Sequence, residues 1–264
     1  MVLSRKYKFV FLHSRKTGGS AVKAYLNHYL GPCDIQLGAW KGAFKNDGGP
    51  NMRVIYDSVR CLLSNPLSSL RPILSCINSI ARRSDKEAVA KLLNHLQKKW
   101  HSFKNPGHPT AHEVEQAFTQ EWNRFWSFCF VRNPFEKAVS DYLWRKRMTG
   151  AEGVSFGEFM NRVAYPKRED PEGMVVFPRT NWSIYTIDDS VAVDFVGRYE
   201  RFEDHLQFAL GEAGVPSIAE KLPKAKESSS YDYRTFYDSH TYSLVETVYQ
   251  KEINKFGYSF ENKC

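Results

Sequence analysis

The sequence lacks the marks of several large classes of protein. Its five cysteines are an odd number and include no C-x-x-C pair, which argues against a disulfide framework and against a zinc site. No run of eighteen apolar residues occurs, so no membrane-spanning helix is predicted. The first eight residues read as polar and basic and contain no apolar segment typical of a signal peptide. These absences favour free thiols in a reducing compartment, and we expect a cytoplasmic protein.

Chain length and net charge further limit the possible folds and binding partners. With 264 residues the chain can bury a full core, and we expect one α/β domain that spans residues 1–264. The formal net charge of +8 predicts anionic partners, namely a nucleotide cofactor, a polyanionic or lipid-linked acceptor, or nucleic acid. Charge by itself does not choose among these partners.

The most informative stretch is the first predicted strand and the loop behind it. Residues 7–12 are rich in aromatic and β-branched side chains and predict a buried strand, and helical spacing resumes at residue 21. The loop between them contains Arg15, Lys16, Thr17, Gly18, Gly19, Ser20 and Ala21. In such a unit, glycines let backbone N–H groups approach an anion, while the helix N-terminus and a lysine add positive charge. The loop is not a Walker A sequence, because Lys16 precedes the glycines.

A second predicted strand, residues 127–131, leads to another possible anion site. Arg132 stands at its end, and Pro134 suits the first position of the helix that follows. Ser140 falls almost two turns into that helix. A guanidinium and a hydroxyl in this arrangement can hold one phosphate together. Two strand–turn–helix anion sites in one chain argue for a ligand with two separated anionic ends, whereas ATP has one polyphosphate end.

Two histidines lie between these motifs. Thr110 with Glu113 three residues later forms a capping box, which predicts a helix that begins there. His108 is left on the loop just outside that helix, and His112 lies on its first turn. A loop pinned by a capped helix suits a side chain that must meet a reacting hydroxyl. A histidine that only caps or packs locally is the alternative.

Together the two motifs resemble those of sulfotransferases that use 3′-phosphoadenosine 5′-phosphosulfate (PAPS), especially the carbohydrate branch. Residues 16–20 are similar to the loop that binds the 5′-phosphosulfate, which commonly reads P-K-T-G-G-T/S, with Arg15 in place of the proline. The V-R-N-P sequence at residues 131–134, with Ser140 eight residues after Arg132, is similar to the 3′-phosphate motif. Animal members usually carry an N-terminal Golgi anchor, so its absence suggests either a cytoplasmic enzyme of bacterial type or a shortened chain.

The resemblance implies a fold and a cofactor site. We expect a P-loop-like central parallel sheet flanked by helices, with residues 33–105 forming a largely helical insertion that faces the acceptor. Residues 15–21, Arg132 and Ser140 are expected to bind PAPS and its product, the 3′,5′-bisphosphate PAP. Lys224 or Lys226 is expected to contact a phosphate from a basic, serine-rich loop.

The resemblance also implies a reaction. The H-x-T-A sequence at residues 108–111 is similar to a segment of the carbohydrate branch, which makes His108 the first candidate for general base, His112 the second, and a carboxylate such as Glu113 the next. Lys16 is expected to neutralise charge on the departing PAP, so that no metal is required. The expected acceptor is a hydroxyl of a glycan, polysaccharide or glycolipid, with peripheral membrane contact left open and no nucleic acid expected. The sequence does not indicate the oligomeric state.

Two other functions stay open from the residues alone. A P-loop nucleotide kinase should show a carboxylate for Mg²⁺ at the end of a buried strand, and we find no convincing stretch of this kind. A non-catalytic module that binds polyanions or nucleic acid should show a continuous basic patch with interleaved aromatic residues.

Overall fold

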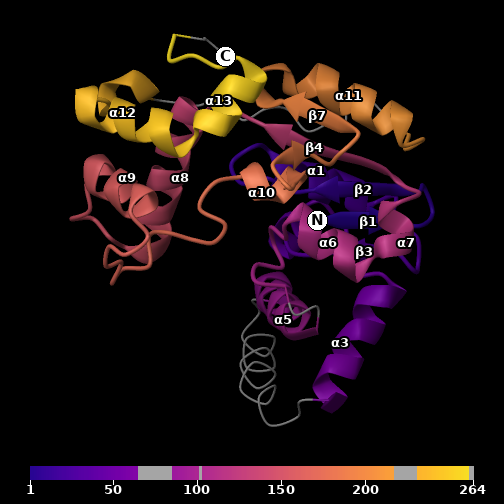
Figure 1. Cartoon of the computed structure of the whole chain (residues 1–264). Helices are drawn as coiled ribbons and strands as arrows, with labels where there is room; N and C mark the ends of the chain where they lie inside the picture. The colour runs from indigo at the N-terminus through magenta and orange to yellow at the C-terminus, as the bar shows by residue number, and fades with distance from the viewer. Residues whose placement is uncertain (65–84, 101–102, 217–230, 262–264) are drawn as a thin grey trace.

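A five-stranded sheet organises the protein (Figure 1). The computed structural model describes residues 1–64, 85–100, 103–216 and 231–261. The strands, in their order across the sheet, are β3 (Ile35–Gln36), β1 (Val2–Ser4), β2 (Phe9–Leu12), β4 (Trp126–Val131) and β7 (Phe195–Arg198). β2, β4 and β7 are parallel neighbours, while β1 runs antiparallel to both β2 and β3. The prediction of an α/β fold around a central sheet is confirmed, and the sheet is mostly parallel.

The first strand of the sheet was not predicted. Met1, Val2 and Leu3 are fully buried, and β1 pairs Val2 with Phe11 and Leu3 with Val10. The description of the first eight residues as a polar, basic terminus is therefore wrong for their first half. Three apolar residues next to charged ones are too short a run to signal a strand, and only pairing with β2 makes them one.

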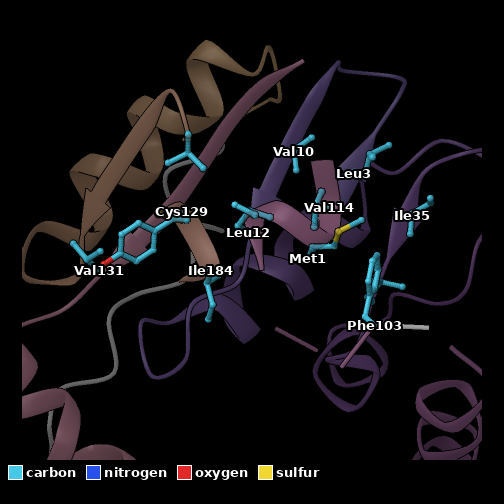
Figure 2. Packing of buried hydrophobic residues seen from close by; sticks show 14 of the residues in the cluster. Met1, Leu3, Val10, Leu12, Ile35, Phe103, Val114, Cys129, Val131 and Ile184 are labelled. Carbon is cyan, nitrogen blue, oxygen red and sulfur yellow. The ribbon is translucent and has the colours of Figure 1, made fainter. Parts of the chain in front are cut away.

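Helices cover both faces of the sheet, because successive strand residues point to opposite sides. On one face, Phe9 and Phe11 pack with residues of α1 (Gly19–Asn27) and α11 (Phe202–Glu212). On the other face, Val10 and Leu12 pack with residues of α6 (Ala111–Ala117) and α10 (Trp182–Tyr185), as Figure 2 shows for Val114 and Ile184. The first cluster joins β2 to α1, and the second fixes the other face of β2, so the loop between β2 and α1 starts and ends on packed elements.

The predicted insertion at residues 33–105 begins inside the sheet. Its first element is the edge strand β3, and the helices α2 (Trp40–Lys45), α3 (Met52–Ser64) and α5 (Asp85–Trp100) follow. Trp40 at the start of α2 is fully buried and donates its indole N–H to Gln97 on α5 at 2.9 Å. In Figure 1, α3 and α5 extend away from the sheet, whereas the start of the insertion belongs to the core.

The remaining elements lie around β4 and β7 and near the end of the chain. Those around β4 and β7 are α7 (Thr119–Trp122), α8 (Pro134–Thr149), α9 (Phe156–Ala164), the hairpin of β5 (Thr186–Ile187) and β6 (Ser190–Val191), η1 (Tyr199–Arg201), η3 (Tyr233–Phe236), α12 (Ser239–Val248) and α13 (Gln250–Phe256). Helices α8, α9 and α12 share a third apolar cluster. None of the helices in the described ranges is both long and apolar enough to cross a bilayer.

Candidate active site

The loop between β2 and α1 has the backbone form of an anion-binding turn. Lys16 and Gly18 adopt left-handed conformations, with φ of 63° and 79°. Gly18 is the N-cap residue of α1 and supplies no side-chain cap, while the Thr17 hydroxyl donates to the Ser14 carbonyl at 2.9 Å. The Lys16 ammonium lies 5.4 Å from the centre of the Trp144 ring on α8. The positive end of α1 and a full positive charge therefore meet at this loop.

Two glycines are required here by packing as well as by backbone form. A Cβ on Gly19 would lie 1.9 Å from Cδ2 of His13, and a Cβ on Gly18 would lie 2.7 Å from the ring of Phe202. Because real Cβ atoms do not approach other atoms so closely, side chains at these positions would push the loop away from β2 and α11. The glycines thus hold the loop close to its neighbours.

Arg132 lies against this loop. Its Nη1 donates to the Lys16 carbonyl at 3.2 Å, and its Nη2 pairs with the carboxylate of Glu136 one turn into α8. The guanidinium also lies 4.3 Å from the centre of the Tyr199 ring. β2 and β4 are parallel neighbours, so their carboxyl ends meet at the same edge of the sheet. The two anion-binding motifs predicted from separate parts of the sequence therefore come together.

Ser140 faces the same region from α8. Burial raises the pKa of the nearby Tyr231 phenol, and the positive charge of Arg132 and the Ser140 hydroxyl both act against that rise. Neither Tyr231 nor Glu136 was among the predicted site residues. The sequence could have indicated Glu136, because it follows Arg132 by four residues at the beginning of a helix, and side chains at this spacing lie close enough to form an ion pair.

Arg15 has a different place from the one expected for a cofactor contact. Its guanidinium donates to the carbonyls of Val176 and Arg179 at 3.0 and 2.9 Å and pairs with Asp141 at 3.3 Å. Its backbone N–H and carbonyl both hydrogen-bond the side-chain amide of Asn181. Because the side chain is buried in these contacts, Arg15 anchors the loop to residues 176–181.

His108 is placed and protonated in a way that suits a general base. Its Nδ1 lies 2.6 Å from the carbonyl oxygen of His13, and since a carbonyl only accepts, Nδ1 carries the proton and Nε2 keeps its lone pair. Burial, followed by the charge of Lys23, lowers the pKa of His108 well below its usual value. The predicted capping box of Thr110 and Glu113 is present and fixes the helix that follows.

The other two candidates for the base are placed less favourably. The side chain of His112 is 59% exposed, and its Nε2 lies 2.9 Å from the side-chain nitrogen of Gln116. The Glu113 carboxylate accepts from the backbone N–H groups of Thr110 and Lys104 at 2.8 and 3.0 Å, so capping already engages it.

His13 and Lys23 form a buried group with His108 that sequence reasoning missed. The rings of His13 and His108 have centres 4.4 Å apart. Lys23 is 1% exposed, and burial lowers its pKa to about 7. His13 could have been noticed from the sequence, because it comes directly after the predicted strand and just before the loop of Lys16. A lysine on a helix is expected at the surface, so the sequence carried no comparable signal for Lys23.

The remaining predictions for the site concern two lysines and the need for a metal ion. Lys224 and Lys226 lie outside the described residues. Within the described ranges, no three His, Cys, Asp or Glu side chains gather in a way that could hold a metal ion. A cavity of about 680 Å³ runs along the side of α1 from Ala21 past Tyr25 and His28 to Lys45 and Asp47. Its lining includes Ala21 but neither Lys16 nor Arg132, so this cavity is not the space between the two motifs.

The chain matches a described protein family over almost its whole length. The model of a family described as "Sulfotransferase family" matches residues 1–259. A stretch of 95 residues is 33% identical to an uncharacterized protein of Archaeoglobus fulgidus and covers 34% of this chain and 68% of that protein. No solved structure matches the chain. Because the family model matches from the first strand to the last helix, the chain belongs to the sulfotransferase family.

Proposed function

We propose that this sulfotransferase moves a sulfuryl group from PAPS to a hydroxyl of a carbohydrate by a single in-line displacement. One observation carries the proposal: Arg132 donates to the carbonyl of Lys16 at 3.2 Å although the two residues are 116 positions apart. This contact brings two anion-binding motifs to one place. PAPS has a 5′-phosphosulfate and a separate 3′-phosphate and so offers one anionic group to each motif.

The residues of the site suit that ligand. The N–H groups of residues 17–20 and the N-terminus of α1 would hold the phosphosulfate, and Arg132 with Ser140 would hold the 3′-phosphate. The ion pair with Glu136 and the ring of Tyr199 keep the guanidinium oriented before any ligand binds. A phosphate would therefore meet a cation whose position is already fixed, which lowers the entropy lost on binding.

His108 and Lys16 would have separate roles in the reaction, His108 as the general base and Lys16 at the leaving group. When bound, PAPS supplies the sulfuryl group and a 3′,5′-bisphosphate leaving group. Nε2 of His108 would accept the proton of the acceptor hydroxyl, and its Nδ1–H bond to the His13 carbonyl would stabilise the charge that the ring gains. Lys16 would neutralise charge on the leaving oxygen, together with N–H groups of its loop. A fixed cation of this kind takes the role that Mg²⁺ has in kinases.

A carbohydrate acceptor is favoured by the motifs around Lys16 and His108 and by the net charge of +8, which suits an anionic glycan or glycolipid. We also propose that α3 and α5 face this acceptor. α5 lies close to the loop of His108, because its Gln97 accepts from the N–H of Gly38 at 3.2 Å and Lys23 joins the carbonyls of Leu37 and Gly107. A molecule bound against α5 would therefore lie near the base.

Calorimetry with PAP and with ATP, each with and without Mg²⁺, tests the proposal. We expect PAP to bind equally well with and without the metal and ATP to bind weakly. Binding of ATP only with Mg²⁺, and no binding of PAP, would indicate a kinase. Binding of polyanions alone, with a steep dependence on salt, would indicate a non-catalytic module. Transfer of labelled sulfate to a panel of glycans, glycolipids and small hydroxyl compounds then identifies the acceptor.

A further inference from the structure

We propose that Lys23 is a positioning residue for the general base: its buried ammonium fixes the loop that carries His108 and keeps the ring of His108 in its proton-accepting form. This inference rests on the proposed role of His108 and deepens it. Lys23 itself contacts no reacting atom, and its effect passes through the histidine.

The contacts of Lys23 tie three elements together. Its Nζ donates to the carbonyl of Gly107 at 3.1 Å, one residue before His108, and to the carbonyl of Leu37 at 2.5 Å, directly after β3. Lys23 belongs to α1, whose N-terminus forms the predicted phosphosulfate site. One side chain therefore links the helix that would hold the donor to the loop that would hold the base. A shift of either element relative to the other would break at least one of these hydrogen bonds.

A lysine in this place has a cost that a purely structural contact would not require. The side chain is 1% exposed and donates to two neutral carbonyls, and the amino group of Met1 beside it partly opposes the lowering of its pKa by burial. Burying an ammonium without a carboxylate partner is unfavourable, and an apolar side chain would fill the same space without that cost. The charge therefore has a use beyond packing, and the nearest titratable rings are those of His13 and His108.

The groups that act on His108 favour its neutral form. Burial has the largest effect and lowers the pKa of His108, and the positive charge of Lys23, followed by those of Arg15 and the amino group of Met1, lowers it further. The bond from Nδ1–H to the His13 carbonyl acts in the opposite direction. Since Lys23 makes the largest contribution after burial, removing its charge should raise the pKa of His108. A base must be neutral to accept a proton, so activity would then be lost at a higher pH.

Nuclear magnetic resonance of protein with ¹³C-labelled histidine measures this effect without an acceptor. The signals of His108 are assigned by their loss in H108Q, and the ring is titrated in the wild type, K23M and K23R. We expect the midpoint for His108 to move to higher pH in K23M and to move less in K23R, which keeps the charge. Lys137 offers a matched control, because it is also 1% exposed but has its Nζ 3.4 Å from the hydroxyl of Tyr249, in another cluster. K137M should leave the His108 midpoint unchanged.

Sulfuryl transfer gives a second readout once an acceptor is known. The acid limb of kcat/KM should move to higher pH in K23M, and kcat should fall on the order of 10²-fold, the cost of displacing a reacting group by about 1 Å. PAP affinity should stay unchanged, because Lys23 is not part of either anion-binding motif. A change confined to KM would contradict a positioning role.

The outcomes separate this inference from the proposed function. If H108A is inactive and K23M folds with an unchanged His108 midpoint, the inference on Lys23 fails alone. If H108A transfers sulfate at the full rate, His108 is not the base and the inference on Lys23 fails, while the proposed sulfuryl transfer stands. If PAP does not bind to the wild type and no sulfate is transferred, the proposed function fails. If K23M does not fold, the wild type still tests the inference. Labelling the lysines with ¹⁵N locates the titration of Lys23, whose pKa burial lowers to about 7, and the His108 signals should show a second, smaller inflection at the pH where Lys23 titrates. A titration of Lys23 without any response of His108 would overturn the inference.

Discussion

Replacing Arg132 by alanine separates the binding of a 3′-phosphate from all other binding at this site. The proposed phosphate contact is a hydrogen bond between two charged groups, which is worth about 1.5 to 3 kcal/mol. R132A is therefore expected to weaken PAP binding about 10- to 150-fold. It should leave the affinity for 5′-AMP unchanged, because 5′-AMP has no 3′-phosphate. Ser140 would supply one uncharged hydrogen bond, so S140A should weaken PAP binding only about 2- to 10-fold.

The ion pair with Glu136 complicates this substitution. Arg132 and Glu136 have side chains that are 6% and 2% exposed, and removing one partner of a buried pair costs about 3 to 5 kcal/mol of folding stability. R132A also loses the contact with the Tyr199 ring, worth about 0.5 to 2 kcal/mol. The double variant R132A/E136Q removes both charges. It should recover most of the stability but none of the PAP affinity.

Calorimetry with PAP and with 5′-AMP on the wild type and both variants, together with thermal unfolding, checks this reasoning. The expected pattern is a loss for PAP only, shared by R132A and R132A/E136Q. Equal losses for PAP and 5′-AMP would mean that Arg132 supports the fold of the site and does not hold the 3′-phosphate. Wild-type affinity for PAP in the double variant would refute the assignment outright.

Further predictions concern the reaction and the loop. K16A should lower kcat by about 10³-fold or more in a labelled-sulfate assay, and near-normal turnover would remove this lysine from the mechanism. H108A should lower kcat by about 10²- to 10⁴-fold without changing PAP affinity, whereas H112A should be close to wild type. Because the pKa of His108 is lowered, the ring stays neutral as pH falls to its ordinary pKa, so kcat/KM should remain level there and fall only at more acidic pH. An acid limb at or above the ordinary histidine pKa would contradict the assignment. G19A should lower the midpoint of thermal unfolding through about 1 to 3 kcal/mol of overpacking, whereas G211A, with no neighbour within 4 Å on α11, should stabilise by about 0.5 to 1 kcal/mol.

Local features of this protein were readable from the sequence because they depend on neighbours within one or two turns. The capping box of Thr110 and Glu113 and the proline that begins α8 both appear where they were predicted. The strand before each anion-binding loop was predicted to within two residues. Backbone hydrogen bonding and side-chain alternation act over such short distances, so a few residues suffice to specify them.

Tertiary structure alone decided which distant residues meet. β1 and β3 are short runs that become strands only through pairing with the rest of the sheet, and Arg15 became an anchor because residues 176–181 lie beside it. The group of His13, Lys23 and His108 comes from three elements, and no spacing in the chain indicates it. Burial sets the pKa of a side chain through what surrounds it, and those surroundings exist only after the chain has folded.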